Sequence, residues 1–315
     1  MLLLYFSACC SSFYREGNAR RGKSYQQRST GSVCPEEIRF IMMPSDEKDI
    51  RLLSEVLPNV AIQLRSAMAN ICGAASRIAT PEAREQDPVL DKTAAVLTMS
   101  CQQMLRLVGN LSAASELSQN SHFRLSNDDV IGFCEGLCGR AEALFELRGV
   151  TLIFSADRQS QIIAMNAAML ERALLNLLSN ALKFTPAGGT VSVRIKTGER
   201  AVQIAVSDTG SGIEPEQLEH IFERYLETDS FQPIPHGLGL GLPLCQRVAR
   251  GHGGRILAQS APGKGTVFTM SLPNTRAAES EFNDVRFDYA GGFDHVLMEL
   301  SDALPREAFM QKNLD

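Results

Sequence analysis

Two runs of apolar residues at heptad spacing restrict the fold of this chain more than any other feature. In the first run the apolar residues follow one another at steps of four and three: Leu53, Leu57, Val60, Leu64, Ala67, Ile71, Ala74 and Ile78. The second run keeps the same spacing and comprises Leu90, Ala94, Leu97, Cys101, Met104, Val108 and Leu111. Such spacing indicates long helices that pack side by side along an apolar seam.

A polar, proline-containing stretch from Thr80 to Pro88 separates the two seams. Two helices joined by so short a connection form an antiparallel hairpin. One hairpin cannot cover both of its own seams, so we expect two chains to pair their hairpins into a four-helix bundle. Residues 44–121 are therefore predicted to be the dimerisation domain of a homodimer. The alternative is a hairpin that packs on another domain of the same chain.

Mixed helices and strands are expected from residue 127 to residue 273. Asn127 is predicted to cap a helix that runs to Leu147, and Asn166 to begin a second helix. Strands are predicted where apolar residues form a short run or alternate with polar ones, which occurs at Val150–Ser155, Val191–Ile195, Val202–Val206 and near Ile256 and Val267. The predicted fold is α+β, with the helical hairpin followed by an α/β sandwich in which helices cover one face of a mixed sheet.

The charge balance narrows the classes of partner. The chain has 31 basic and 36 acidic residues, for a net charge of −5. It therefore has no polybasic field of the kind that attracts nucleic acid or anionic lipid, and neither is an expected partner. No apolar run approaches the roughly 18 residues of a membrane span. The expected location is the cytoplasm.

The two ends of the chain are expected to lie outside the main domains. Residues 1–41 are predicted to be a disordered or non-native extension, because Met42 and Met43 directly precede the first well-patterned segment and offer another translation start. Residues 274–315 form a predicted C-terminal tail. A short amphipathic helix is expected there over residues 293–309, packed on its own domain by Val296, Leu297, Leu300 and Leu304.

Three polar residues share one face of the helix that Asn166 begins. Asn176, Asn180 and Lys183 follow one another at i, i+4 and i+7, away from the leucine stripe of that helix. Asn is a poor helix former, so two on one stripe indicate a function. Amide oxygens facing a hydrated cation, with an ammonium one turn beyond to meet phosphate, would provide it. The alternative is a solvated face.

Two glycine-rich segments follow. Asp208–Gly212 comes directly after an alternating strand, where glycines let backbone approach a flat ligand and a buried carboxylate accepts a donor. Gly237–Leu242 opens a helix, whose free N–H groups bind phosphate. This second segment is neither a Walker loop nor a dinucleotide-binding fingerprint, because no Gly-Lys-Ser/Thr follows it and no strand precedes it.

Taken in order, these motifs resemble the catalytic domain of sensor histidine kinases, in the superfamily that includes gyrase, Hsp90 and the mismatch-repair ATPases. The matching motifs are the N box from Asn176 to Pro186, the first glycine box Asp208–Gly212, the F box Ile221–Tyr225, the second glycine box Gly237–Leu242, and Gly263–Thr266. The resemblance spans roughly 220 residues, strongly over the last 110 and loosely over the hairpin.

The resemblance implies that the chain binds ATP with Mg²⁺. It assigns Asn180 to Mg²⁺, Lys183 to the phosphates and Asp208 to the adenine amino group, with Thr266 supporting Asp208 and residues 227–236 forming the mobile lid. Asn176 stands where hydrolysing relatives have a glutamate base, so ATP would be held for transfer rather than hydrolysed quickly. The remaining nucleotide-binding residues are expected to be Gly210, Gly212, Phe222, Arg224, Gly237, Gly239, Leu240 and Gly241.

The sequence departs from the family at the phosphoacceptor. Ile62 occupies the position of the histidine in the first bundle helix, and Gln63 replaces the neighbouring acid, although Leu64 and Arg65 stay in register. The five histidines, His122, His220, His236, His252 and His295, all lie outside the predicted helices of the hairpin. No catalytic residue is therefore assigned.

Three functions remain open. The first is a degenerate histidine kinase that binds ATP and signals through its bundle to a response regulator of a two-component system without phosphorylating itself. The second is an active transferase whose acceptor is Ser66 or a residue of a partner protein. The third is a structural dimer in which nucleotide only stabilises the fold.

Overall fold

The computed structural model describes residues 45–116, 124–222, 239–278 and 294–314 of the chain. Residues 49–315 form one compact unit. The predictions for residues 1–41 and for residues 227–236 lie outside the described residues. Among those that are described, no helix is long and apolar enough to span a lipid bilayer.

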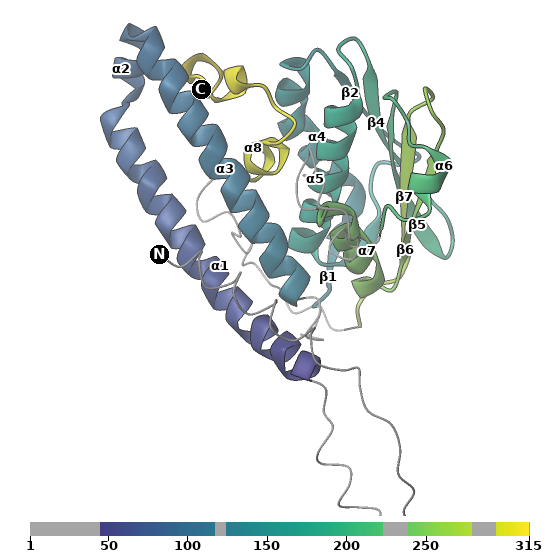
Figure 1. Cartoon of the computed structure of the whole chain (residues 1–315). Coiled ribbons are helices and arrows are strands. Elements are labelled where there is room, and N and C mark those ends of the chain that lie inside the picture. The colour runs from purple at the N-terminus through teal and green to yellow at the C-terminus, as the bar shows by residue number, and fades with distance from the viewer. Residues whose placement is uncertain (1–44, 117–123, 223–238, 279–293, 315) are drawn as a thin grey trace, which may run out of the picture. The chain divides into compact units, whose positions relative to one another are not determined.

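Two long helices run antiparallel in the first part of the chain, as Figure 1 shows. They are α1 (Ser45–Ile78) and α3 (Pro88–Glu116), and between them the predicted break contains one short helix, α2 (Pro81–Gln86). The side chain of Thr80 caps α2 by accepting the N–H of Ala83 at 3.3 Å. The Asp87 carboxylate in turn accepts the N–H groups of Val89 and Leu90 and so begins α3. The predicted helical hairpin is present.

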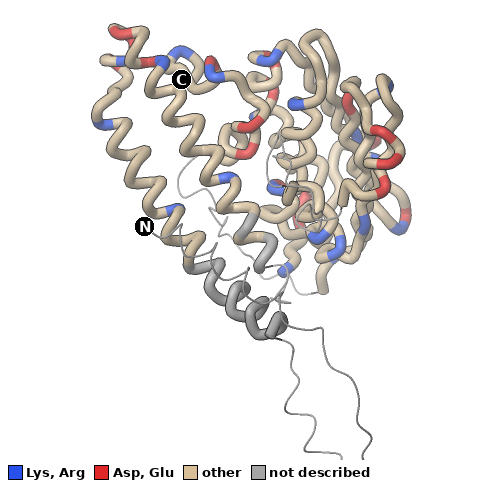
Figure 2. The backbone as a smooth tube through the Cα atoms, viewed as in Figure 1, with Lys and Arg blue, Asp and Glu red and all other residues tan. Residues whose placement is uncertain are grey.

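Much of the seam surface on these helices is exposed to solvent within the single chain. The exposed seam residues whose side chains are described are Val60, Leu64, Ile71, Ile78, Leu97 and Met104. The contact between α1 and α3 involves Met68, which lies off the first seam, together with Leu105 and the seam residue Cys101. Charged residues are sparse along the described parts of both helices, residues 60–78 of α1 and residues 88–113 of α3 (Figure 2). The seam side chains of Leu53, Leu57 and Leu111 lie outside the described residues.

The predicted sandwich is built on a five-stranded mixed sheet of order β2-β4-β5-β7-β6. Its strands are β2 (Thr151–Ala156), β4 (Thr190–Thr197), β5 (Ala201–Asp208), β6 (Arg255–Ser260) and β7 (Thr266–Pro273). β2 and β4 run parallel, and the other neighbouring pairs are antiparallel. A separate ribbon pairs β1 (Ser126–Asp129) with β3 (Ile162–Met165).

Helices α4 (Val130–Glu146), α5 (Ala167–Phe184) and α7 (Gly241–Gly251) cover one face of the sheet in Figure 1. A fourth, short helix, α6 (Pro215–Leu218), follows β5. The core lies between the leucine stripe of α5 and the alternate residues of β4 and β5, which are fully buried: Val191, Val193, Ile195, Val202, Ile204 and Val206. The predicted fold class is confirmed.

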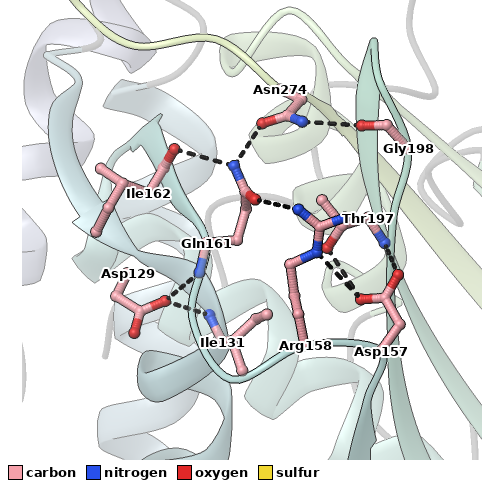
Figure 3. Close-up of polar contacts among 9 residues, drawn as sticks. All are labelled: Asp129, Ile131, Asp157, Arg158, Gln161, Ile162, Thr197, Gly198 and Asn274. Carbon is pink, nitrogen blue, oxygen red and sulfur yellow. Dashed lines mark hydrogen bonds and ion pairs between the residues drawn. The ribbon is translucent and has the colours of Figure 1, made fainter.

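The predicted helix cap at Asn127 is wrong, because Asn127 lies in β1 and pairs with the chain beyond β7. Its side-chain amide donates to the carbonyl of Ala277 at 3.1 Å and accepts the N–H of the same residue at 2.8 Å. Asp129 caps α4 instead, accepting the N–H of Ile131 (Figure 3). The same carboxylate oxygen accepts the N–H of Gln161 at 2.8 Å, which joins the start of α4 to β3.

The predicted tail helix over residues 293–309 is also shorter than expected. Only α8 (His295–Leu300) is α-helical, and two 3-10 turns follow, η3 (Arg306–Phe309) and η4 (Gln311–Asn313). Pro305 explains the interruption, because the residue before a proline disfavours helical backbone. The expectation that this segment packs on its own chain is confirmed, since Val296, Leu300 and Leu304 are buried in the main core.

Candidate nucleotide-binding site

Helix α5 carries the first group of candidate residues. Its N-cap, Asn166, accepts the N–H of Met169 at 3.0 Å, as the sequence predicts. The leucine stripe faces the sheet, so Asn176, Asn180 and Lys183 lie on the opposite side of the helix. Asn180 and Lys183 are half-buried, whereas only 1% of the Asn176 surface is exposed.

Asn176 is enclosed by groups from three other positions in the chain. Its amide nitrogen donates to the carbonyl of Arg172 at 2.9 Å, and its Oδ1 accepts from Arg106 of α3 at 3.4 Å. Gly241, at the start of α7, lies so close that a Cβ there would stand 2.7 Å from the same Oδ1. A side chain at position 241 would therefore displace Asn176, which explains why this part of the second glycine box is glycine.

Lys183 lies in the last turn of α5, one residue before its end. Burial lowers the pKa of its ammonium, while the neighbouring carboxylate of Asp302 opposes that shift and the guanidinium of Arg106 adds to it. A partly desolvated ammonium is suited to bind a phosphate group. Its position agrees with the role that the family resemblance implies.

Asp208 is the last residue of β5, and only 8% of its surface is exposed. Its Oδ1 accepts two backbone N–H groups, from Gly210 at 2.8 Å and from Thr266 at 3.2 Å. Burial raises the pKa of this carboxyl, and the two hydrogen bonds oppose the rise. Within the part of the chain that the structure describes, Oδ2 accepts no hydrogen bond, so this oxygen is available to an amino group of a ligand.

The backbone around Asp208 comes too close for side chains at two of the glycines. A Cβ at Gly210 would stand 2.5 Å from the carbonyl oxygen of Phe184, and one at Gly265 would stand 2.0 Å from that of Asp208. Gly265 also has a φ of +77°, in the left-handed region that side chains disfavour. These glycines bring the end of α5, the first glycine box and β7 together around one carboxylate.

Other predicted site residues are placed as follows. Phe222 of the F box packs edge-to-face on Phe268 of β7, with ring centroids 6.3 Å apart. Gly239, Leu240 and Gly241 lead into α7, and Gly212 lies beside the chain at Ala261. Arg224 and Gly237 lie outside the described residues.

The structure adds a group of charged residues that the sequence analysis did not identify. Arg106 of α3 and Arg172 of α5 meet Glu299 of α8, and Arg106 also pairs with Asp302. A signal for the α3 side exists in the sequence, since Gln102, Arg106 and Asn110 place polar side chains at steps of four along one face of the helix.

The described residues fit Mg²⁺ only as a companion of nucleotide phosphates. They contain no group of three His, Cys, Asp or Glu side chains that could hold a metal ion. Asn180 supplies a neutral amide oxygen, which suits a hydrated ion bound chiefly by phosphate oxygens. The site residues therefore fit Mg²⁺ bound together with ATP.

Comparison with known proteins agrees with this arrangement. Residues 165–276 match the model of the family described as histidine kinase-, DNA gyrase B-, and HSP90-like ATPase. Sensor histidine kinase CusS of Escherichia coli is 32% identical over 220 residues, which are 68% of this chain and 44% of the relative. Sensor histidine kinase WalK of Bacillus subtilis is 28% identical over 234 residues, covering 73% of this chain and 38% of the relative. The chain thus spans less than half the length of these two relatives.

A solved structure shares the fold over much of the chain. The full-length ShkA structure in complex with AMPPNP superposes with a TM-score of 0.57 at 24% identity, covering 72% of this chain and 47% of that one.

Proposed function

This chain belongs to the sensor histidine kinase family by its ATPase domain at residues 165–276, and we propose from this that it binds Mg-ATP between α5, the Asp208 loop and the start of α7. The observation that carries the proposal is the arrangement of Asp208. Two backbone N–H groups fix its Oδ1 and leave Oδ2 to accept the adenine amino group.

The other site residues have distinct proposed tasks. Lys183 attracts the phosphates, and Asn180 faces the Mg²⁺ that accompanies them. ATP, when bound, supplies the phosphoryl group for transfer. Asn176 has an amide where a base would be needed to deprotonate water, so the site holds ATP instead of hydrolysing it quickly.

The phosphoacceptor position distinguishes this chain from an ordinary histidine kinase. Ile62 is 57% exposed on α1 and has no proton-accepting or nucleophilic group. We therefore propose that the protein does not phosphorylate itself there and signals to a response regulator through its helical hairpin. A second candidate is transfer to Ser66, whose hydroxyl is exposed one helical turn beyond Ile62.

A homodimer is part of the proposed function. The exposed seam of α1 and α3 is apolar and carries few charges, and a second copy of the same hairpin would cover it. The partner response regulator would then dock on the bundle so formed.

Ligand-dependent melting tests the ATP site. Mg-ATP at about 100 times its Kd should stabilise the fold by about 2.7 kcal/mol, because a ligand that binds only the folded state shifts the unfolding equilibrium. Asp208→Ala should abolish the shift in melting temperature. Asp157→Ala is the matched control, because the Asp157 carboxylate accepts the N–H of Thr197 (Figure 3), at the end of the sheet opposite Asp208. Its replacement should leave the shift in melting temperature intact. No shift of the unaltered protein at millimolar ATP would refute the site.

A further inference from the structure

Helix α8 and the turn that follows it bring two carboxylates to the basic side of the candidate nucleotide site. Glu299 is fully buried, with its Oε2 3.3 Å from Nε of Arg106 and its Oε1 3.9 Å from Nε of Arg172. Asp302 pairs with Nη1 of the same Arg106 at 2.5 Å and acts electrostatically on Lys183. Two negative charges from the C-terminal segment therefore face three positive charges.

These contacts connect three separate parts of the chain. Arg106 belongs to α3 of the hairpin, and its Nη2 also donates to Oδ1 of Asn176 in the N box. Gly109, one turn along α3, has Arg172 so close that a Cβ would stand 2.9 Å from its Nη2. Further along the segment, the carbonyl of Phe309 accepts from Arg84, and Gln103 donates to the carbonyl of Ser301. The segment thus holds α3 against α5 beside the phosphate-binding face.

The polar part of this junction is imperfectly satisfied. Among the described residues, four buried oxygen atoms of α3 and of residues 299–301 have no hydrogen-bond partner: Gln102 Oε1, Asn110 Oδ1, Glu299 Oε1 and Ser301 Oγ. Burial also raises the pKa of Glu299, although both arginines oppose the rise. Buried charges and polar atoms that lack full hydrogen-bond partners stabilise a contact only weakly. The contact between α3 and the C-terminal segment therefore has the character of an interface that opens.

The basic side chains are of the kind that binds a polyphosphate, yet the chain neutralises them itself. A carboxylate beside Lys183 repels an anionic ligand and reduces the local positive potential. We propose that residues 294–314 form an autoinhibitory strap. In it the carboxylates of Glu299 and Asp302 neutralise the basic side chains that would otherwise bind the ATP phosphates, and they hold α3 against the N box. The proposal rests on the ATP site of the proposed function.

Charge-neutralising variants of the full chain test the strap. Asp302→Asn is the main variant because this side chain is partly exposed and its replacement is isosteric, and Glu299→Gln is the second. Glu307→Gln is the matched control, because it removes one exposed negative charge from the same segment, where Glu307 pairs with Arg306 and not with Arg106 or Arg172. Each protein is measured for Mg-ATP binding at equilibrium and, without nucleotide, for amide hydrogen exchange over α3.

The strap predicts that Asp302→Asn lowers the Kd for Mg-ATP about threefold to tenfold, an effect of a single nearby charge that weakens at high salt. Hydrogen exchange of α3 should accelerate in both main variants. The control should match the unaltered protein in both measurements.

The possible failures are distinct. Unchanged exchange in both main variants would show that these carboxylates do not hold α3, and faster exchange with unchanged Kd would show that they do not restrain nucleotide. Either result would overturn the strap. If neither the unaltered protein nor any of the three variants bound ATP at millimolar concentration, the proposed ATP site would be wrong. The proposed inhibition of that site would then be wrong as well.

Discussion

At the scale of single residues, His252 ties the start of α5 to the end of α7. Its Nε2 accepts the backbone N–H of Asn166 at 3.0 Å, so this nitrogen carries no proton. Its Nδ1 lies 2.8 Å from the carbonyl of Val248 and donates to it. The neutral imidazole thus fits both bonds, and protonation would place an N–H against the N–H of Asn166. Burial accordingly lowers the pKa of His252 below its ordinary value of 6.5.

This shift predicts how stability depends on pH. Below pH 6.5 His252 is protonated in the unfolded chain but stays neutral in the folded chain. The free energy of unfolding therefore falls as the pH falls, by at most about 1.4 kcal/mol per pH unit. The stability is retained above pH 6.5 and lost towards the lower folded pKa. Urea unfolding at pH 7.5, 6.5 and 5.5 measures the slope. His252→Gln should lower stability at every pH but flatten the slope, and equal slopes would contradict the assignment.

Individual site residues were predictable from sequence where one motif contains the partners. Asp208 and Gly210 are two positions apart, and both the carboxylate and its close backbone donor follow from that spacing. Arg106 and Glu299 are 193 positions apart and come together only through tertiary packing. The polar stripe of α3 marks Arg106 in the sequence, but nothing local indicates that it pairs with Glu299.

At the scale of elements, periodicity predicted the helices and strands better than their ends. The seams of α1 and α3 extend over many turns, and the alternation of β4 and β5 reflects burial on one face of a sheet. Caps depend on fewer atoms. Asn127 and Asp129 are both good capping residues, and the pairing of β1 with β3 decides between them, because it leaves Asn127 within the ribbon. The proline at position 305 was visible in the sequence and shortens the tail helix.

The exposed seam predicts a test of assembly. Leu64 is 42% exposed in the single chain and lies on the seam of α1. If a second hairpin covers it, Leu64→Glu buries an unpaired carboxylate in each chain, at about 3 kcal/mol for each charge, and dimers should dissociate. Analytical ultracentrifugation measures the mass.

The neighbouring exposed residue provides the control for this test. Gln63→Glu introduces the same charge one position away from the seam, where it should stay in solvent and leave the dimer intact. A monomeric unaltered protein, or equal dissociation of the two variants, would contradict the bundle.

At the scale of the whole molecule, the chain combines a histidine kinase-like ATPase domain with a helical hairpin in which Ile62 stands at the proposed acceptor position. The backbone N–H of Thr266 donates to the Asp208 carboxylate, which joins two of the predicted motifs, whereas Ile62 of α1 is exposed to solvent. We therefore expect the missing imidazole, and not a damaged nucleotide site, to prevent autophosphorylation.

Restoring the acceptor tests this expectation directly. The double change Ile62→His and Gln63→Glu introduces a nucleophile and its neighbouring acid on an exposed face of α1, so incubation with γ-labelled ATP should yield acid-labile, base-stable label. Adding Asn180→Ala should remove the label by removing the amide that we propose faces Mg²⁺. The outcome depends on whether the new imidazole comes within reacting distance of the γ-phosphate of ATP, because misplacement of the reacting atoms by one ångström lowers a rate about a hundredfold. Absence of label despite measured ATP binding would mean that α1 no longer reaches the nucleotide, which favours a scaffold. Label on the unaltered protein would move the acceptor to Ser66 or another residue.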